Sequence, residues 1–313
     1  MNLISIVVPC YNEQEAIPVF YRILEMVKSK MPLVEFEYWF VDDGSSDDTL
    51  KQMKKLRSQD TSVHYISFSR NFGKEAGLLA GLRNAVGSGR GAQFVAIMDV
   101  DLQDPPELLP DMYQILMEEN VDCVGTRRVN RKGEPIIRSF FARVFYWLIN
   151  KMSDVEIVDG ARDYRLMRRM MVDAILEDNE YNRFSKGIFS WVGFRTKWLE
   201  FPNIERVNGK SKWSFWKLFR YSVEGILAYS TLPLSIASVV GIVFCAVSFL
   251  SMVVIVVRAL VYGDPVAGWP SMISIITFLG GVQLLCLGII GLYLSKTYME
   301  TKRRPNYIIR EKE

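Results

Sequence analysis

Two aspartates, Asp99 and Asp101, have the side-chain type and spacing that most directly indicate chemistry in this chain. They lie two positions apart at the end of a hydrophobic run, residues 94–98, so a straight strand would direct both carboxylates to one face. Carboxylate oxygens are hard ligands that suit Mg²⁺ or Mn²⁺. A D-x-D pair is common by chance, but here a loop, residues 102–107, follows and opens a helical pattern. We therefore predict a divalent-metal site rather than a solvated turn.

Further polar loops follow two other strand patterns. Tyr11-Asn12-Glu13 comes after the first hydrophobic run, and Asp42-Asp43-Gly44-Ser45 comes after the second. A carboxylate there can accept hydrogen bonds from a ribose or a base N–H, although the second loop is also typical of a turn and helix N-cap. The chain has neither G-x-G-x-x-G after its first strand nor G-x-x-x-x-G-K-[ST], so neither a dinucleotide site nor a P-loop is indicated. Phosphates would have to be held by a metal and by cationic side chains.

The elements that must position these loops alternate between β-rich runs and helical patterns up to about residue 125. The patterns predict strands at residues 3–8, 37–41, 63–68, 94–98 and 122–124, and helices at residues 15–30, 49–57, 74–86 and 106–119. Such alternation predicts an α/β domain with a mostly parallel, Rossmann-like sheet and right-handed crossovers. Ligands of open parallel sheets bind at the carboxyl ends of the strands, where the three acidic loops would converge.

Composition argues against some classes of function. The net charge is +3 over 313 residues, which is too small to indicate a nucleic-acid partner. The four cysteines are scattered without metal-ligand spacing, and we interpret them as buried hydrophobic side chains of a protein facing a reducing compartment. The first residues lack a basic n-region and are typical of a strand rather than of a signal peptide.

Two uncharged apolar runs, residues 234–257 and 272–294, are each long enough to cross the roughly 30 Å hydrocarbon layer as a helix. The connection 258–270 is short and contains glycine and proline, so we predict a two-helix transmembrane hairpin; a hairpin buried in a soluble core is the alternative. The tail, residues 297–313, is rich in Lys and Arg, and the positive-inside rule places it in the cytoplasm. Two crossings return it to the side of the catalytic domain. Both termini are therefore expected in the cytoplasm, at a bacterial inner or plasma membrane.

Two aromatic and basic segments, residues 138–152 and 210–221, have the composition of helices that lie in a membrane interface. Their rings could instead pack into the soluble core, an alternative that the sequence leaves open. The predicted organisation is a cytoplasmic catalytic domain at residues 1–209, a juxtamembrane amphipathic helix at 210–232, two transmembrane helices within 233–296 and a basic cytoplasmic tail at 297–313.

Several motifs, in this order, make the whole chain similar to one family. They are Pro9-Cys10-Tyr11-Asn12-Glu13, Val41-Asp42-Asp43-Gly44-Ser45-Ser46-Asp47, Ser69-Arg70-Asn71-Phe72-Gly73-Lys74, Asp99-Val100-Asp101-Leu102-Gln103-Asp104-Pro105-Pro106, Asp163-Tyr164-Arg165-Leu166-Met167 and the run from Arg206 to Trp213. The chain resembles the family 2 inverting glycosyltransferases with a GT-A fold. Within these it resembles the polyprenyl-phosphate glycosyltransferases, relatives of bactoprenol glucosyl transferase and dolichol-phosphate mannose synthase.

The resemblance implies a role for each motif residue. A metal, Mg²⁺ or Mn²⁺, would be bound mainly by Asp101, with Asp99 and Gln103 close to the diphosphate of a nucleotide sugar. Pro9, Tyr11, Glu13 and Asp43 would contact the nucleoside, and Lys74 would bind the donor. Arg127 and Arg138 would contact a lipid phosphate, and Arg206 and Lys212 would contact the phosphates at the membrane edge. Asp163 would lie close to the reacting sugar. One departure concerns Arg162, because many relatives have a glycine at that position.

The resemblance also implies the reaction, in which one sugar moves from a nucleotide sugar to a polyprenyl phosphate, with undecaprenyl phosphate expected in a bacterium. A phosphate monoester is mostly dianionic at pH 7, so it needs no strong base, and Asp163 could be a base or a positioning group. A single displacement would invert the anomeric centre and give a lipid-linked sugar for modification of cell-envelope glycans. UDP-N-acetylglucosamine and UDP-glucose are the favoured donors, and GDP-mannose is the alternative.

Other readings remain open at this stage. A processive polysaccharide synthase would be expected to carry a Q-x-x-R-W motif and more spans, and the sequence has neither. A non-catalytic membrane scaffold or lipid transporter would leave the acidic loops without a role. The resemblance further implies a homo-oligomer, for which a tetramer is one form.

Overall fold

The computed structural model describes residues 2–128, 158, 160–178, 180–202, 232–262 and 268–313. Its strands are β1 (Asn2–Cys10), β2 (Val34–Asp42), β3 (Val63–Phe68), β4 (Phe94–Ile97), β5 (Cys123–Arg128), β6 (Ala161–Arg168), β7 (Thr196–Phe201) and β8 (Ile309–Lys312). Its helices are α1 (Ala16–Ser29), α2 (Thr49–Gln59), α3 (Lys74–Gly87), the 3₁₀ turn η1 (Pro106–Leu108), α4 (Leu109–Glu118), α6 (Arg169–Glu177), α7 (Ser185–Trp191), α9 (Leu232–Tyr262) and α10 (Trp269–Thr301).

One eight-stranded sheet, in the order β7-β5-β6-β4-β1-β2-β3-β8, organises the α/β part of the described chain. Strands β4, β1, β2 and β3 are neighbours and all pair in parallel, which confirms the parallel arrangement predicted for the first four strands. The prediction of a mostly parallel sheet was too broad, because β6 is antiparallel to both β4 and β5, and β8 is antiparallel to β3. Arg127, near the end of β5, pairs with Ala161, the first residue of β6. Strand β6 therefore begins beside the end of β5 and runs in the opposite direction. The fold is therefore α/β with a mixed sheet.

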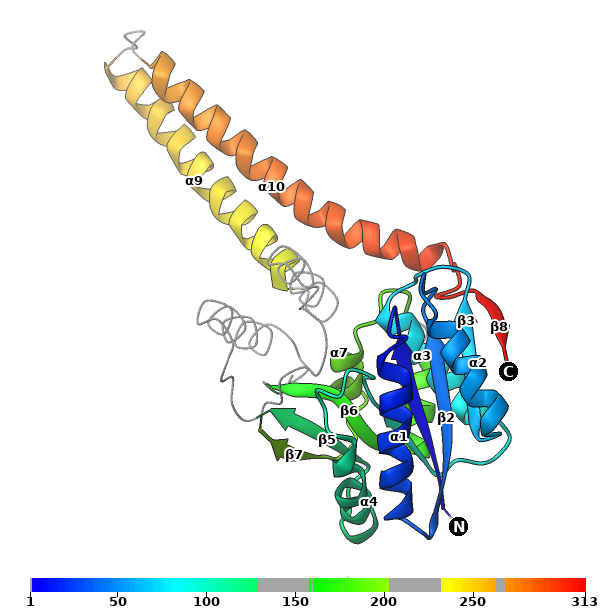
Figure 1. The fold of residues 1–313 in the computed structure, drawn as a ribbon. Helices are drawn as coiled ribbons and strands as arrows, with labels where there is room; N and C mark the ends of the chain where they lie inside the picture. Colours follow the sequence, from blue (N-terminus) through cyan, green and yellow to red (C-terminus); the bar gives the residue numbers. More distant parts are fainter. Residues whose placement is uncertain (1, 129–157, 159, 179, 203–231, 263–267) are drawn as a thin grey trace.

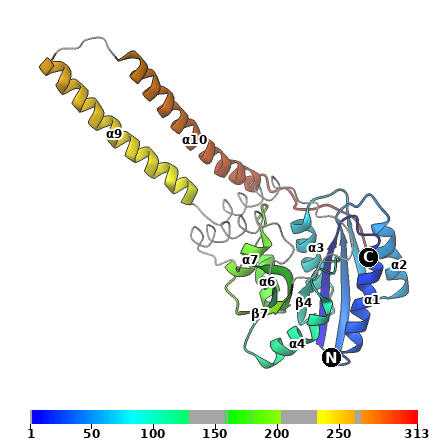
Figure 2. The ribbon, with the colours of Figure 1, turned by 60° about the vertical axis from the view of Figure 1, so that its left-hand side comes forward.

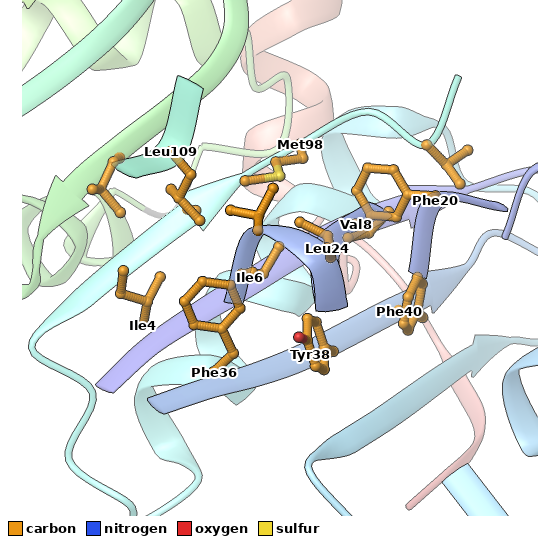
Figure 3. Packing of buried hydrophobic residues seen from close by; sticks show 14 of the residues in the cluster. Ile4, Ile6, Val8, Phe20, Leu24, Phe36, Tyr38, Phe40, Met98 and Leu109 are labelled. Carbon is orange, nitrogen blue, oxygen red and sulfur yellow. The ribbon is translucent and has the colours of Figure 1, made fainter. Parts of the chain in front are cut away.

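Helices cover both faces of this sheet (Figures 1 and 2). Because side chains of a strand alternate between faces, Ile4, Ile6 and Val8 of β1 join the core beneath α1, α2 and α4, whereas Val7 joins the core beneath α3, α6 and α7. Figure 3 shows the first of these cores, where Phe20 and Leu24 of α1 lie over the side chains of β1 and β2. The burial of apolar surface on both faces fixes the strand register and hence the positions of the loops at the strand ends.

The sequence patterns did not predict three of the observed strands, β6, β7 and β8. Strand β6 carries Arg162, Asp163, Arg165 and Arg168 among its eight residues, so its apolar alternation is interrupted by charge. Strand β7 pairs with β5 at the far edge of the sheet, and only its last residue is fully buried. Strand β8 lies within the segment predicted as a basic tail, and its four residues alternate between half-buried and exposed. Strands β7 and β8 lie at the two edges of the sheet, where short, charged strands are common and carry little sequence signal.

The two apolar runs form helices α9 and α10, which lie side by side and extend away from the sheet (Figures 1 and 2). The rings of Phe244 and Phe278 lie 5.4 Å apart, and large apolar side chains such as Ile242 and Leu284 remain exposed along both helices. Among the described residues, one stretch, Phe278–Thr301, meets the length and hydropathy expected of a membrane-crossing helix. In both views α10 ends beside the α/β domain, at the edge where β1 and β2 end.

Candidate active site

Four loops meet at the carboxyl edge of the parallel strands: the three acidic loops that the sequence predicted, and the loop that follows β3. They follow β1, β2, β3 and β4, which are adjacent in the sheet. The first two loops are tied together by backbone-to-side-chain hydrogen bonds: the N–H of Asn12 donates to Ser45 Oγ at 2.9 Å, and the N–H of Ser46 donates to Asn12 Oδ1 at 2.9 Å. Asn12 itself has a left-handed backbone, with φ of 55°. The loops therefore form a continuous polar rim.

Asp43 connects this rim to the third loop. Its carboxylate accepts the backbone N–H groups of Phe72 at 2.6 Å and Gly73 at 2.9 Å. Burial raises the pKa of Asp43, although the two backbone hydrogen bonds oppose that shift. Gly44 comes next with φ of +65°, and a Cβ there would lie 2.7 Å from the backbone N of Asn71, so only glycine allows the two loops to approach so closely. Asp43 is thus a buried link that orders the segment leading to Lys74.

Lys74 joins two acidic loops that are far apart in the sequence. Its Nζ lies 2.7 Å from Asp99 Oδ1, 2.9 Å from Asp99 Oδ2 and 2.5 Å from Asp163 Oδ2. Desolvation would lower the pKa of Lys74, but the negative charges of Asp163 and Asp99 outweigh it and raise the pKa. The Lys74 side chain is 43% exposed, so this ion-pair bridge faces the solvent side of the rim. A predicted donor-binding lysine, a predicted metal ligand and the predicted sugar-side aspartate therefore lie together.

Asp163 has further cations beside it. The side chain of Lys186, from α7, donates to the carbonyl of Ala161 at 3.2 Å. Arg165 is buried and stacks on the Phe189 ring, with its guanidinium carbon 3.6 Å from the ring centroid. Burial would raise the pKa of Asp163, but the charges of Lys74 and Lys186 and the hydrogen bond from Lys74 hold that pKa well below its usual range. Asp163 is therefore an ionised carboxylate at neutral pH.

The D-x-D segment has the donor chemistry of a metal site that is completed by substrate. Asp101 Oδ1 accepts the backbone N–H of Gln103 at 3.1 Å, and Leu102 between them has φ of 56°, which turns the chain sharply at this point. Among the described residues, no group of three or more His, Cys, Asp or Glu side chains is close enough to hold a metal alone. Two carboxylates suit Mg²⁺ and Mn²⁺, which commonly share their coordination between protein carboxylates and the phosphate oxygens of a nucleotide. The residues present therefore fit the predicted ion.

Arg162 has a structural partner in the same loop. Its Nε donates to Asp104 Oδ1 at 2.6 Å, and its Nη2 lies 3.5 Å from Gln103 Oε1. The Asp104 side chain is 1% exposed, and its burial raises its pKa although the Arg162 charge opposes the shift. The arginine that departs from the pattern of many relatives thus holds the loop between Asp101 and η1 against β6.

The other predicted site residues are placed as follows. Pro9 lies near the end of β1, Tyr11 is 42% exposed at the rim, and the backbone N–H of Glu13 donates to Thr49 Oγ1 at 2.8 Å. Arg127 lies in β5, with Nη1 3.8 Å from Glu200 Oε1. Arg138, Arg206 and Lys212 lie outside the described residues, as do the predicted interface segments 138–152 and 210–221.

Comparison with known proteins identifies the family. The profile of glycosyl transferase family 2 matches residues 5–176, which is more than half of the chain. The chain belongs to glycosyl transferase family 2. It is 41% identical over 310 residues to the bactoprenol glucosyl transferase of Shigella phage SfX, covering 99% of each chain. It is 39% identical over 307 residues to the prophage bactoprenol glucosyl transferase homolog of Escherichia coli (strain K12), covering 98% of each. Among solved structures it is similar to S. aureus TarS 1–349 in complex with UDP-GlcNAc, with a TM-score of 0.43 and 19% identity over 73% of this chain and 67% of that one.

As a family 2 glycosyltransferase the protein is an enzyme, and its fold is of the α/β, GT-A-like kind that the resemblance implied. Sequence reasoning missed several polar residues at its rim. Glu75, in the first turn of α3, accepts hydrogen bonds from the N–H and the hydroxyl of Ser185, and the next residue, Lys186, lies near Asp163. Ser185 and Lys186 lie outside all the motifs quoted above. The helix that contains them, α7, is only seven residues long, so its periodicity gives little sequence signal. The signal that could have directed attention to Arg165 was its place in the D-Y-R-L-M motif.

Proposed function

We propose that this glycosyltransferase moves one sugar from a nucleotide sugar to a polyprenyl phosphate at the cytoplasmic face of a membrane. The observation that carries the proposal is spatial: the rim that holds Lys74, Asp99 and Asp163 lies at the edge of the sheet where α10 ends beside the domain. A water-soluble donor could reach this rim from the cytoplasm, while an acceptor headgroup could reach it from a leaflet. The names of the full-length relatives, bactoprenol glucosyl transferases, support a lipid phosphate acceptor.

The pairing of β8 supports two membrane crossings with both ends in the cytoplasm. The chain leaves the catalytic domain before α9 and rejoins its sheet at β8, which pairs with β3. An element that returns to the same folded domain must cross the bilayer an even number of times. If Phe278–Thr301 lies in a membrane, the other crossing falls to α9, whose exposed face is equally apolar. The excess of Lys and Arg in residues 297–313 then favours the cytoplasm for the domain and both termini.

Within this proposal, Asp101 and Asp99 bind Mg²⁺ or Mn²⁺ together with the diphosphate oxygens of the donor, and Gln103 lies beside them. The bound ion would neutralise the charge that develops on the leaving diphosphate. Pro9, Tyr11, Glu13 and Asp43 would contact the nucleoside, the last through the loop that it orders. Cationic side chains would hold the lipid phosphate, for which we propose Arg127 and Arg138. Arg206 and Lys212 would contact the phosphates of the donor at the membrane edge.

The chemistry needs alignment more than proton transfer. The acceptor phosphate is mostly dianionic at pH 7 and can attack the anomeric carbon directly. Asp163 is best suited to hold the sugar, because it is ionised and its oxygen is already bonded to Lys74. In-line displacement inverts the anomeric centre, so an α-linked donor gives a β-linked lipid product.

We propose the identities of the sugar donor and of the lipid acceptor only from the similarity of the chain to its relatives. UDP-glucose is favoured by the names of the relatives, and UDP-N-acetylglucosamine by the Ala161-Arg162-Asp163-Tyr164-Arg165 variant of the motif. Undecaprenyl phosphate is the proposed acceptor, and the product would serve cell-envelope glycan modification. We also propose that the protein is a homo-oligomer, with a tetramer as one form.

A donor panel tests the reaction. Membranes that contain the full chain are incubated with polyprenyl phosphate, Mg²⁺ or Mn²⁺ and one radiolabelled nucleotide sugar at a time, and the lipid is extracted. Label is expected in the organic phase from one donor. Asp101→Asn should reduce that transfer by about a hundredfold or more, since a bound metal contributes several kcal/mol to the transition state. Asp173→Asn is the matched control, because Asp173 lies on α6 and pairs with Arg169 at 2.8 Å, away from the rim. Transfer from no donor, or full activity of Asp101→Asn, would contradict the proposal.

A further inference from the structure

Lys74 holds a carboxylate that the proposed metal also needs. Its ammonium lies within 2.9 Å of both oxygens of Asp99, which leaves neither oxygen of that side chain without a cation beside it. A divalent ion bound to these oxygens would lie within a few ångströms of the ammonium, and the two positive charges would repel each other. The metal and Lys74 therefore compete for Asp99.

The rest of the rim determines where Lys74 can go. Its backbone is fixed at the start of α3, just after Gly73, whose N–H is bonded to Asp43 at 2.9 Å. Its side chain, however, is 43% exposed and can change rotamer without opening the core. A second acceptor, Asp163 Oδ2, already lies 2.5 Å from the same nitrogen. Loss of Asp99 would therefore leave the ammonium paired with Asp163.

We propose that Lys74 is a built-in competitor of the divalent metal at Asp99, displaced onto Asp163 when the metal arrives. The inference rests on the metal site of the proposed function and assigns a role to this chain's own lysine. It predicts that the free enzyme binds metal weakly and that a nucleoside diphosphate strengthens binding, because phosphate oxygens add ligands for the metal and negative charge near the displaced ammonium. The metal and the donor would then bind together, and the Lys74 ammonium would pair with Asp163 alone once the metal is bound.

Metal binding without any turnover tests this inference. The purified full chain in detergent is titrated with Mn²⁺ in the absence of nucleotide, and free Mn²⁺ is followed by its electron paramagnetic resonance signal. Lys74→Gln should lower the Mn²⁺ Kd by at least about tenfold relative to the unmodified chain. Lys74→Arg keeps the charge and should leave the Kd close to its original value. Lys74→Met is a second neutral variant in case Lys74→Gln is poorly folded, which a thermal melt would reveal.

The matched control is Lys186→Gln. Lys186 also lies near Asp163, but it bonds to the carbonyl of Ala161 and not to Asp99. If the effect comes from direct occupation of Asp99, Lys186→Gln should change the Mn²⁺ Kd by less than about threefold, the scale of a screened interaction at a distance. An equal effect of both lysine variants would show that overall charge alone is responsible and would overturn the inference.

The remaining outcomes separate this inference from the proposed metal site. UDP should lower the Mn²⁺ Kd of the unmodified chain. The Mn²⁺ Kd values of the unmodified chain and of Lys74→Gln should then be closer to each other than they are without UDP. The metal site is supported if the unmodified chain binds Mn²⁺ in the presence of UDP and Asp101→Asn does not. The competitor role of Lys74 is wrong if, in the same experiments, the neutral Lys74 variants bind Mn²⁺ without nucleotide no more tightly than the unmodified chain does. If neither the unmodified chain nor any Lys74 variant binds Mn²⁺ with or without UDP, both are wrong.

Discussion

At the scale of single residues, the state of Asp163 decides which chemistry the rim can perform. A general base works best when its pKa is close to the working pH. The pKa of Asp163 lies well below its usual range, because the charges of Lys74 and Lys186 outweigh burial. The carboxylate is therefore charged throughout the neutral range and a poor acceptor of protons. Electrostatics thus favour a positioning role, with the acceptor phosphate supplying its own nucleophilic charge.

The pH dependence of turnover distinguishes these roles. With Asp163 ionised at all working pH values, kcat/KM should fall on the acid side only as the lipid phosphate dianion takes up one proton and becomes a monoanion, near pH 6. Asp163→Asn should lower kcat and leave this acid limb at the same pH. The measurement is the pH profile of kcat/KM for both proteins between about pH 5 and pH 8, across the phosphate pKa near 6. An acid limb that disappears or shifts in Asp163→Asn would assign the titration to Asp163 and refute the positioning role.

Arg162 shows how a charged side chain beside a motif can have a structural role. The resemblance implied a glycine at this position in many relatives. In the structure its guanidinium is bonded to Asp104, whose side chain is 1% exposed. Removal of one partner from such a pair leaves a buried charge uncompensated, which is costly. The position of the loop between Asp101 and η1 therefore depends on this arginine.

At the scale of secondary-structure elements, the end of α10 is bound to the loop that precedes α7. The Glu300 carboxylate accepts the N–H of Tyr181 at 2.9 and 3.1 Å and that of Asn182 at 3.3 Å. Lys296 donates to Asn182 Oδ1 at 3.1 Å. The same loop leads into Ser185 and Lys186, which contact α3 and β6 at the rim. The end of α10 and the ion-pair bridge therefore contact the same loop and the helix that follows it.

Limited proteolysis measures how much Glu300 restrains this loop. In Glu300→Ala the two N–H groups lose a charged acceptor, a contribution of about 1 kcal/mol, so chymotrypsin should cleave after Tyr181 about fivefold faster. Glu311→Ala is the control, because Glu311 pairs with Lys54 of α2 at 2.7 Å rather than with the loop that contains Tyr181. Equal cleavage rates in the two variants would show that the loop is held by other contacts.

At the scale of the whole molecule, strand β8 ties the end of the chain to the catalytic sheet. Tyr307 stacks on Phe68 with ring centroids 5.1 Å apart, and the N–H of Glu313 donates to the carbonyl of Tyr65 at 3.1 Å. If α9 and α10 cross a membrane as proposed, these contacts require the end of α10 to lie on the same side of the bilayer as the catalytic sheet. The proposed topology is thus a consequence of sheet pairing as well as of charge distribution.

Cysteine labelling in intact and permeabilised bacterial spheroplasts tests this topology. Tyr262→Cys lies at the end of α9, where the tyrosine is 81% exposed, and should react with a membrane-impermeant maleimide in intact spheroplasts. Glu313→Cys should react only after permeabilisation. The unmodified chain gives the background, since Cys10 and Cys123 are buried. Labelling of Glu313→Cys in intact spheroplasts, or of Tyr262→Cys only after permeabilisation, would contradict an even number of crossings with both ends inside.

Much of the fold could be predicted because its signals are local. Strand β3 was predicted with its observed bounds, and α3 differs by one residue, because apolar alternation and helical periodicity span only a few neighbours in sequence. The polar loops at the strand ends converge as expected once the strands pair in parallel. Strands β6 and β8 could not be predicted, since their charged residues obscure the alternation and their partners lie far away in the sequence.

The sequence by itself determined the family, the acidic loops and the two apolar runs, because each depends on residue type and short spacing. Only the tertiary structure decided which charges meet. Lys74, Asp99 and Asp163 come from the start of α3, the end of β4 and strand β6, and Lys186 joins them from α7. Coulomb energies depend on distances of a few ångströms, and those distances are set by sheet order and helix packing rather than by separation along the chain.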